Sequence, residues 1–315
     1  MMKTDADKII ELANKSNLIK HGGNSKIHKV KFESRYFCVK DYSQRADSNY
    51  RMQKEFNSLV KLSEHKSSIF ALPLGYSEKS SRAVYEWLNG TTPKMDSECI
   101  NYMFLIIKKL NSIAQSSHHN DFKKATDFIF KKIDIAEQLQ ERFSRVSLTN
   151  LKIPTNIFRD LESALNFVSS KCELRGEPLI TLSVSDLGSH NLLWDKELSE
   201  LHCVDLEFFG WDDAHKLCMD TLLHPKNEWN FELGFQFVSE FKLIHHVDTN
   251  RLLDFWNLLN LKWGLIVLSK YLREQDFQIQ NNKQIGTLEL AHRYILRSVK
   301  KISTIEDIIE QSSIK

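Results

Sequence analysis

The chain has 315 residues, of which 42% are hydrophobic and 27% charged, proportions typical of a soluble globular protein with one large domain or two lobes. Its 43 Lys and Arg against 41 Asp and Glu leave a formal net charge of +2, which argues against nucleic acid as the main partner. Only 10 Gly and 5 Pro occur, so collagen-like and low-complexity architectures are excluded and long helices are favoured.

Cysteine usage and hydropathy predict a cytoplasmic protein without a membrane partner. The five cysteines are scattered and form no CxxC pair, which fits reduced thiols better than a disulfide framework or a zinc site. The first residues, MMKTDADKIIELANK, are polar and show no secretory signal. The most apolar stretch, residues 252–272, is interrupted by Asp254, Lys262 and other polar residues, so it predicts a buried core helix.

The amino-terminal part predicts a small mixed lobe. Two short alternating segments flank a polar break at Glu33-Ser34, which is typical of a β-hairpin. Helical spacing and two further strand-like runs follow, and the second run ends at Asn89-Gly90. The predicted elements are strands at 26–32 and 35–40, a helix within 44–64, and strands at 69–75 and 82–88. Residues 1–90 are therefore predicted to form one lobe.

The remaining residues, 91–315, predict a larger and mainly helical lobe. Apolar residues recur at three- and four-residue steps over several long segments, and short apolar runs between them are too brief for helices. The predicted helices are 99–113, 122–143, 155–172 and several within 227–312, and the short runs are 179–182, 192–194 and 201–206.

The segment SVSDLGSHNLLW, followed by HCVDLEFFGW, contains the groups that a phosphoryl-transfer site needs. Asp186 precedes Asn191 by five residues, and Asp205 and Glu207 follow a short predicted hairpin. One carboxylate can orient or deprotonate an attacking hydroxyl, while an amide oxygen and a second carboxylate can hold Mg²⁺ against phosphates. The D-x-x-x-x-N spacing is common by chance, but a strand-borne D-x-E fourteen residues later makes the set more specific.

The predicted small lobe can supply phosphate-binding groups. The turn formed by Gly22, Gly23, Asn24 and Ser25 leads into the first hairpin strand, and backbone N–H groups in such a turn can cover anionic oxygens. Lys40 ends the apolar strand FCVK, from which a cation can reach the phosphates of a nucleotide. Glu55, fifteen residues later on the predicted helix, could pair with Lys40.

These landmarks, GGNS, FCVK, the glutamate of RMQKEFNSL, VYEWLNG, SDLGSHNLLW and VDLEFFGW, resemble the aminoglycoside phosphotransferase and choline kinase-like family. The resemblance runs from about residue 19 to about residue 225 in collinear order. It implies an α+β, bilobal protein-kinase-like fold with a small antiparallel-sheet N-lobe and a large, mainly helical C-lobe. It also implies ATP and Mg²⁺ as cofactors and a small-molecule hydroxyl as the phosphoryl acceptor.

The resemblance implies a role for each matching residue. Asp186 would be the catalytic base, Asn191 and Asp205 would bind Mg²⁺, and Glu207 would support a second metal ion. Lys40, held by Glu55, would contact the ATP phosphates beneath the turn of residues 22–25. The remaining implied contacts are to adenine: backbone groups of Glu86 and Leu88 in a hinge at 84–88, and the apolar side chains of Ile27, Val39 and Leu193.

Three positions depart from the family pattern. Val184 stands where the family has a histidine two residues before the catalytic aspartate. The later Asp-Pro becomes Asp213-Ala214, and the following Asp-Leu becomes Lys216-Leu217, with Asp220 as a conjectured replacement carboxylate one turn on. Because the reacting Asp, the two metal ligands and Lys40 are all retained, we expect an active enzyme.

Other protein classes fit the sequence less well. It contains no G-x-S-x-G, G-x-G-x-x-G or Walker A pattern, which argues against a serine hydrolase, a dinucleotide-binding fold and a P-loop NTPase. It lacks D-F-G and A-P-E, which argues against a protein kinase. A sugar or other metabolite hydroxyl is favoured as acceptor. The alternatives are an aminoglycoside-type antibiotic kinase and a catalytically dead ATP-binding scaffold, and the oligomeric state is not readable.

Overall fold

The computed structural model describes residues 3–16, 18–21, 25–43, 46–149, 152–275 and 282–313. Within these residues the protein is an α+β structure that divides into two compact units. Unit 1 comprises residues 1–126 and 182–211, and unit 2 comprises residues 127–181 and 212–315. The predicted lobe boundary near residue 90 stays a prediction.

Unit 1 contains the main sheet and the hairpin that follows the loop of residues 184–191. Its elements are α1 (Lys3–Ala13), β1 (Leu18–His21), β2 (Lys26–Phe32), β3 (Arg35–Asp41), α2 (Ser48–Ser63), β4 (Pro73–Ser77), β5 (Arg82–Glu86), α3 (Ser97–Ser116), the 3₁₀ turn η2 (Ser189–Asn191), β7 (Leu192–Asp195) and β8 (Glu200–Cys203). Two further strands, β6 (Ile180–Ser183) and β9 (Gly210–Asp213), pair with each other, and the division between the units falls within both.

The main sheet has the order β1-β2-β3-β5-β4 with antiparallel neighbours. The predicted hairpin is confirmed: Phe32 lies opposite Arg35, and Glu33 in the turn between them has a φ of 55°. The predicted helix and the last two strands are also present, although β4 begins at Pro73, four residues later than expected. The sequence reasoning missed α1 and β1.

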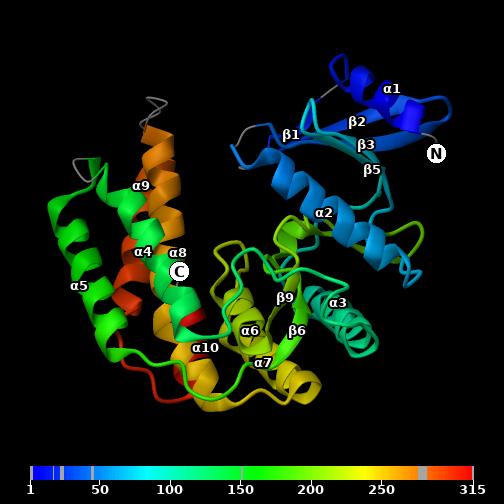
Figure 1. Ribbon diagram of the computed structural model, residues 1–315. Coiled ribbons are helices and arrows are strands. Elements are labelled where there is room, and N and C mark those ends of the chain that lie inside the picture. The colour runs from blue at the N-terminus through cyan, green and yellow to red at the C-terminus, as the bar shows by residue number, and fades with distance from the viewer. Residues whose placement is uncertain are drawn as a thin grey trace. The chain divides into compact units, whose positions relative to one another are not determined.

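Alternation along β3 sends neighbouring side chains to opposite faces of the sheet. Val39 joins the buried cluster that Ile9 and Ile10 of α1 form with Val30 and other strand residues. Lys40 points to the other face, where it meets Glu55 of α2. Figure 1 accordingly shows α1 and α2 on either side of the sheet.

The predicted helix at 122–143 is wrong over its first ten residues. Residues 123–126 run beside β9 and the residues just before it, and the N–H groups of Ala125 and Thr126 donate to the carbonyls of Trp211 and Phe208 at 2.9 and 3.1 Å. These long-range hydrogen bonds replace the i→i−4 bonds that a helix would need. The helix begins only at Lys132, where Asp134 accepts from the N–H of Lys131.

Gly210, at the start of β9, packs where no side chain fits. Its φ is +156°, and an added Cβ would lie 2.3 Å from the Lys123 carbonyl oxygen and 2.5 Å from the Ala125 nitrogen. We expect Gly210→Ala to lower the free energy of unfolding by at least about 3 kcal/mol, because backbone must move to accommodate the methyl group. Urea denaturation would measure the change.

Gly286 provides the matched control for that substitution. It lies within a helix of unit 2, and a Cβ there would meet no atom within 4 Å. Gly286→Ala should therefore stabilise the protein by about 0.5–1 kcal/mol through helix propensity. Equal effects of the two substitutions would contradict the packing argument for Gly210.

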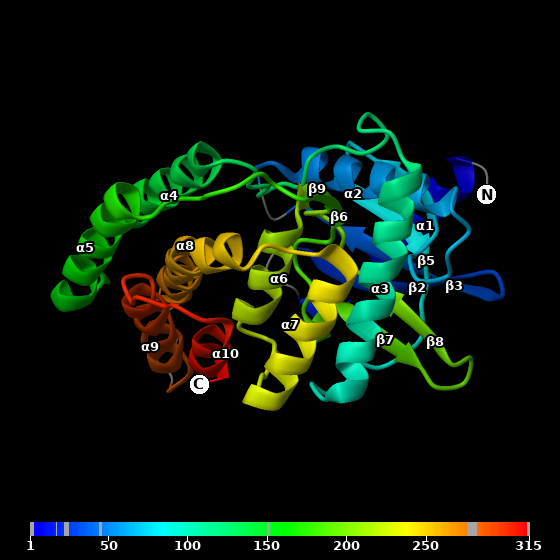
Figure 2. The same ribbon diagram turned by 90° about the horizontal axis from the view of Figure 1, so that it is seen from below.

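Unit 2 is mainly helical. Its elements are α4 (Lys132–Ser147), α5 (Thr155–Lys171), α6 (Ala214–Leu223), α7 (Phe231–His245), α8 (Thr249–Gln275), α9 (Asn282–Arg297) and α10 (Ile305–Ser313), and Figure 2 shows them from below. The predicted core helix at 252–272 is confirmed as α8, which buries Phe255, Trp256 and Leu259. Gly264 lets α8 approach Ala291 and Ile295 of α9 closely.

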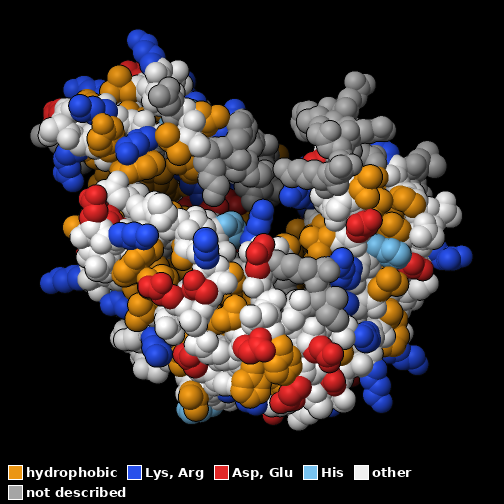
Figure 3. All heavy atoms as spheres, turned by 180° about the vertical axis from the view of Figure 1, so that it is seen from behind, with side chains coloured by type: hydrophobic (Ala, Val, Ile, Leu, Met, Phe, Trp, Pro, Cys, Tyr) orange, Lys and Arg blue, Asp and Glu red, His pale blue; other side chains and the backbone are white. Residues whose placement is uncertain are grey.

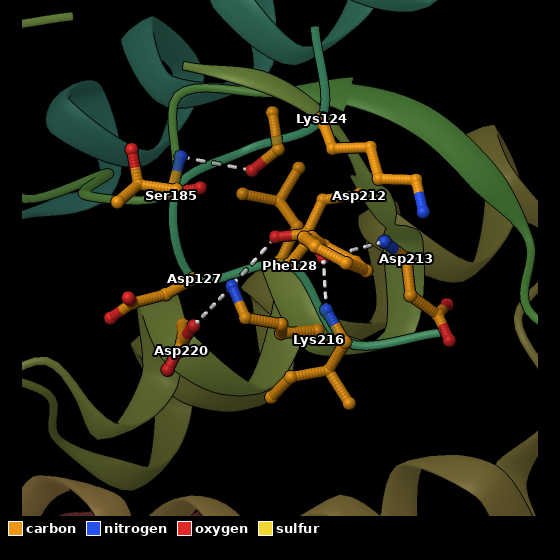
Figure 4. Close-up of polar contacts among 12 residues, drawn as sticks. Lys124, Asp127, Phe128, Ser185, Asp212, Asp213, Lys216 and Asp220 are labelled. Carbon is orange, nitrogen blue, oxygen red and sulfur yellow. Dashed lines mark hydrogen bonds and ion pairs between the residues drawn. The ribbon is translucent and has the colours of Figure 1, made fainter. Parts of the chain in front are cut away.

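Buried ion pairs cross-link the helices of unit 2. The Lys216 amino group lies between the carboxylates of Asp212 and Asp220, at 2.6 and 2.9 Å, as Figure 4 shows. The Arg251 guanidinium bonds Asp213 at 2.7 Å, and Asp213 also caps α6 by accepting from the N–H of His215. Charges removed from water in this way require partners, and here each is paired.

His245, at the end of α7, makes the stability of unit 2 depend on pH. Burial, together with the charges of His215 and His246, lowers the pKa of His245 to about 4 from its ordinary value of 6.5. Because the folded pKa is depressed, the unfolded chain binds the proton first as pH falls below 6.5. We expect the free energy of unfolding to fall by roughly 1.4 kcal/mol per pH unit from this group, reaching about 3 kcal/mol near pH 4.

Urea denaturation of the wild-type chain and His245→Phe between pH 7 and pH 4 measures this contribution. The variant cannot take up the proton, so its stability should fall less steeply than that of the wild type. His118→Asn is the control, because His118 is an exposed histidine that does not contribute to the pKa shift of His245. Parallel pH profiles for the wild type and His245→Phe would refute the assignment.

No helix in the described parts of the chain is both long and apolar enough to cross a bilayer. Basic and acidic side chains are interspersed over the face drawn in Figure 3, with apolar side chains between them.

Candidate active site

Lys40 sits at the centre of a buried polar cluster in unit 1. Its amino group lies 2.7 Å from a Glu55 carboxylate oxygen and also pairs with Asp205, which is 165 residues away in the sequence. Burial by itself would lower the pKa of Lys40, but the charges of Asp205 and Glu55 outweigh burial and raise that pKa well above its ordinary value. Lys40 is therefore a permanently charged, fixed cation.

Glu55 is held in place by hydrogen bonds to both of its carboxylate oxygens. One oxygen accepts from Lys40 and from the Tyr42 hydroxyl at 2.7 Å, and the other accepts from the Leu206 N–H at 3.1 Å. Tyr42 in turn shares a hydrogen bond of 2.9 Å with Tyr85. With its oxygens used in this way, Glu55 positions Lys40 and anchors the backbone next to Asp205.

Asp205 leaves strand β8 in a strained conformation. Its φ is +66°, a value uncommon for residues other than glycine, and its side chain is 38% exposed. Strain of this kind persists where the surrounding structure fixes it, and here the Leu206–Glu55 hydrogen bond does so. The Asp205 carboxylate therefore forms an ion pair with Lys40 and is also partly exposed to solvent.

Glu207 lies deeper than Asp205 and pairs with Arg51 of α2. Burial, together with the charge of Asp205, raises the pKa of Glu207 to about 7, although Lys40 and Arg51 oppose this. A cation placed beside Asp205 and Glu207 would relieve their repulsion.

Asp186 and Asn191, the predicted catalytic base and metal ligand, contact each other directly. The Asn191 side-chain NH₂ donates to the Asp186 backbone carbonyl and to its carboxylate, both at 3.1 Å. The Asn191 carbonyl accepts from the Val204 N–H at 2.9 Å, so the loop is attached to the residue before Asp205. Burial and the charges of Asp186, Asp205 and Glu55 all raise the pKa of the Cys203 thiol, which lies on the strand before Asp205.

The loop has internal hydrogen bonds despite the valine at 184. Val184 is buried and apolar. The Ser183 hydroxyl accepts from the Ser185 N–H at 2.9 Å, and the Asp186 carbonyl accepts from the Gly188 N–H at 3.0 Å. Ser185 has a φ of 60°, so the backbone turns sharply just before Asp186. These bonds hold Asp186 in its loop with Val184 at the position where the resemblance led us to expect a histidine.

The chemistry of the donor set fits Mg²⁺. Carboxylate oxygens of Glu55, Asp205 and Glu207 lie within 4.8 Å of one another. Mg²⁺ prefers such oxygen ligands and is usually held by one or two carboxylates together with phosphate oxygens and water. Because Glu55 already accepts three hydrogen bonds, Asp205 and Glu207 are the better candidates for holding the ion.

One of the residues predicted to contact adenine, Val39, does not lie near the polar cluster around Lys40. Val39 is fully buried against α1, on the sheet face opposite to Lys40, so it does not share a face with the phosphate-binding lysine. Ile27 lies directly opposite Lys40 in the β2–β3 pair and therefore shares its face. Leu193 lies in β7, opposite His202, and is partly exposed.

The structure describes only part of the predicted phosphate-binding turn at residues 22–25, and it describes the predicted hinge at residues 84–88. Gly22, Gly23 and Asn24 lie outside the described residues, whereas Ser25 is buried immediately before β2. The Glu86 N–H donates to the Leu72 carbonyl at 2.9 Å, so this group already has a partner. Leu88 follows β5 in irregular backbone and is partly buried.

Sequence reasoning missed three side chains that complete the cluster: Arg51, Tyr42 and Tyr85. A signal for Arg51 existed, because it lies four residues before Glu55 and therefore on the same face of α2. Tyr42 follows Lys40 by two residues, the spacing that keeps side chains on one face of an extended chain. Nothing near Tyr85 in the sequence indicated its hydrogen bond to Tyr42.

The conjectured replacement carboxylate in unit 2 has a defined partner. Asp220 bonds Lys216 at 2.9 Å and accepts from the indole N–H of Trp263 at 3.1 Å. Figure 4 shows it close to the amino group of Lys216, with Asp127 nearby. Asp220 thus shares with Asp212 the compensation of the buried Lys216 charge.

Comparison with known proteins identifies the fold of the chain. No protein-family model and no curated protein matches the sequence. Among solved structures, a choline/ethanolamine kinase family protein from Mesorhizobium loti is similar over 100% of both chains, with a TM-score of 0.62 and 13% identity. Choline kinase LicA from Streptococcus pneumoniae covers 92% of this chain and 98% of its own, with a TM-score of 0.58 and 14% identity.

A spectinomycin phosphotransferase solved with ADP and spectinomycin is also similar, over 98% of both chains, with a TM-score of 0.55 and 14% identity. These likenesses establish the fold. The chain has the α+β, bilobal protein-kinase-like fold of choline and ethanolamine kinases and aminoglycoside phosphotransferases, which confirms the predicted fold class and the resemblance seen in the motifs at the level of the fold.

Proposed function

We propose that the protein is an ATP-dependent phosphotransferase that moves the γ-phosphoryl group to a hydroxyl of a small molecule. The observation that carries the proposal is the buried contact of Lys40 with both Glu55 and Asp205. A lysine fixed by a helix glutamate and an aspartate that follows a strand is the arrangement that kinases use to hold a triphosphate. The ADP-bound structural neighbour supports the nucleotide assignment.

The chemistry would rest mainly on positioning and charge. Asp186 would accept the proton of the acceptor hydroxyl while the hydroxyl oxygen bonds the γ-phosphorus, and the bond from that phosphorus to the bridging oxygen of ADP breaks. Lys40 would neutralise phosphate oxygens, and Asn191 would keep Asp186 oriented through the 3.1 Å hydrogen bond. Bound Mg²⁺, held by Asp205 and Glu207 with Asn191 as a further ligand, would neutralise charge on the triphosphate.

A sugar or other metabolite hydroxyl is the acceptor class we favour. Around Lys216 the cations and carboxylates of unit 2 pair with one another, so this network offers no acidic surface for a polycationic antibiotic. The reduced thiols, all buried or partly buried, fit an enzyme acting in the cytoplasm, where ATP is abundant.

ADP release over a panel of sugars, choline-like amines and aminoglycosides tests the proposal. We expect Mg²⁺-dependent turnover on at least one hydroxyl compound. ATP binding without turnover on any acceptor would favour a nucleotide-binding scaffold instead. Absence of ATP binding in the presence of Mg²⁺ would refute the phosphotransferase assignment altogether.

A further inference from the structure

Three charged residues of α2 are buried on one face of the helix. Arg51 is 4% exposed, and Lys54 and Glu55 are each 3% exposed. Their spacing of three and four residues places them on the same side of α2. Because a buried charge needs a partner, the groups that these side chains contact show what this face of the helix is fixed to.

Two of these residues contact the segment between β8 and β9. The Leu206 N–H donates to a Glu55 carboxylate oxygen at 3.1 Å. The Arg51 guanidinium pairs with the Glu207 carboxylate, whose side chain is 1% exposed. The central carbon of the guanidinium also lies 5.1 Å from the centre of the Phe208 ring. One face of α2 is thereby fixed to three consecutive residues of that segment.

Lys54 fixes the same face to a neighbouring segment. Its amino group donates to the Lys124 carbonyl at 3.0 Å and to the Thr126 hydroxyl at 2.7 Å. The Thr126 N–H in turn donates to the Phe208 carbonyl at 3.1 Å. Lys54 therefore acts at one remove, whereas Arg51 forms its ion pair with the segment between β8 and β9 itself.

The segment between β8 and β9 contains no residue that phosphorylation could charge. In protein kinases, phosphorylation of a loop creates new pairs with arginine side chains, and these pairs help to place the helix whose glutamate binds the lysine. Residues 204–213, VDLEFFGWDD, include no Ser, Thr or Tyr. The Glu207 carboxylate instead gives Arg51 an anionic partner that requires no modification.

We propose that Arg51 is a positioning residue of the nucleotide site. Its ion pair with Glu207 holds α2 against the segment between β8 and β9, and α2 in turn holds Glu55 at the 2.7 Å distance from Lys40. Arg51 acts through Glu55 and Lys40 and does not itself touch a reacting group. Its effect on ATP binding rests on the proposed phosphotransferase function, whereas its effect on the placement of α2 does not.

Hydrogen exchange of the nucleotide-free protein tests the placement of α2. The Leu206 amide reports on it directly, because its acceptor is the Glu55 side chain. Arg51→Met keeps a long side chain but removes the charge. We expect it to speed exchange of the Leu206 amide at least about tenfold, the factor that corresponds to loss of a hydrogen bond to a charged group. Unchanged exchange at Leu206 would overturn the proposal.

Arg82→Met is the matched control, because it removes another partly buried ion pair of unit 1. Arg82 pairs with Asp41 at 2.9 Å, and the two residues lie opposite each other in the β3–β5 pair. Alternation along β3 places Asp41 on the sheet face opposite to Lys40. Arg82→Met should therefore leave exchange of the Leu206 amide at the wild-type rate.

Calorimetric titration with ATP in the presence of Mg²⁺, and separately with adenosine, tests the consequence for the nucleotide site. Lys40 would contact only the phosphates, which adenosine lacks. Arg51→Met should therefore lower the affinity for ATP at least about tenfold and leave the affinity for adenosine within about twofold of the wild type. A purely structural defect would weaken the binding of both ligands equally, and that result would overturn the proposal.

Two further variants keep the test decisive if Arg51→Met fails to fold. Arg51→Gln can still donate a hydrogen bond to Glu207 but carries no charge, so it should weaken ATP binding several-fold. Arg51→Lys retains the charge and should bind ATP within about threefold of the wild type, although it loses the forked geometry of the guanidinium. Equal ATP affinities of Arg51→Gln and Arg51→Lys would contradict a role for the Arg51 charge.

The two measurements separate failure of this inference from failure of the proposed function. If the wild-type chain binds no ATP in the presence of Mg²⁺, the phosphotransferase assignment fails, and the exchange rate of the Leu206 amide alone decides the role of Arg51. If the wild type binds ATP and Arg51→Met changes neither its affinity nor the exchange rate, only the inference about Arg51 fails.

Discussion

Asp186→Asn is expected to lower the turnover number roughly 10²–10⁴-fold, the range that loss of a general base produces. The substitution preserves size, and the new amide oxygen can still accept the hydrogen bond of 3.1 Å that Asn191 donates to the carboxylate. The loop should therefore keep its shape while losing the group that takes the hydroxyl proton. ADP release under saturating ATP and acceptor would measure the change, and ATP affinity should remain near the wild-type value.

Asp195→Asn is the matched control for Asp186→Asn. Asp195 lies at the end of β7, and its carboxylate accepts from the N–H groups of Glu197 and Leu198 at 2.9 and 3.2 Å in the turn of the β7–β8 hairpin. Asp195 is not part of the polar cluster around Lys40. The turnover number of Asp195→Asn should therefore stay within about twofold of the wild-type value. Near-wild-type turnover in Asp186→Asn would remove Asp186 from the proposed mechanism.

Asp205→Ala should abolish Mg²⁺-dependent ATP binding, with a loss of affinity of at least about 100-fold. The carboxylate is the most exposed member of the group that surrounds Lys40, with 38% of its side chain accessible. Its removal leaves Lys40 paired with Glu55 at 2.7 Å, so the buried cation keeps a partner and the fold should persist. Calorimetric titration of ATP with and without Mg²⁺ would measure the affinity.

Glu200→Ala serves as the control for Asp205→Ala, since Glu200 begins the same strand but lies opposite Asp195 in the hairpin. It should bind ATP with the wild-type dependence on Mg²⁺. The thermal midpoint of Asp205→Ala should also stay within a few degrees of the wild type. An Asp205→Ala protein that still binds ATP more tightly with Mg²⁺ than without would exclude Asp205 as a metal-holding residue.

Patterns within a few neighbouring residues correctly predicted those strands and helices whose sequence signal lies within the element itself. The hairpin of β2 and β3 was visible because alternation and a polar break at Glu33-Ser34 are both confined to adjacent residues. The same holds for α3 and α5, whose apolar residues recur at helical spacing, whereas α8 was predicted from its long apolar content. Helix α1 was missed although its buried residues recur at three- and four-residue steps, at Ala6, Ile9, Ile10 and Ala13, so a local signal was present.

The sequence predicted those residues of the candidate site that lie close together along the chain. Asp186 and Asn191 are five residues apart, and their contact follows from one loop. The supporting side chains were not predictable, because Tyr42 meets Glu55, and Arg51 meets Glu207, through the packing of different elements. Val39 shows the opposite error: a residue next to Lys40 in the sequence lies on the other face of the sheet.

By itself the amino-acid sequence determined the motif order, the strand and helix types of most segments, and the identity of the charged residues that could act on a phosphate. Only the tertiary structure decided that Lys40 meets Asp205 across 165 residues, and that residues 123–126 pair with β9 and the residues just before it. The physical reason is that the periodic placement of side chains and the conformation of turns depend on residues that are neighbours in the sequence. Ion pairing, burial and backbone pairing act between whichever segments the fold brings together.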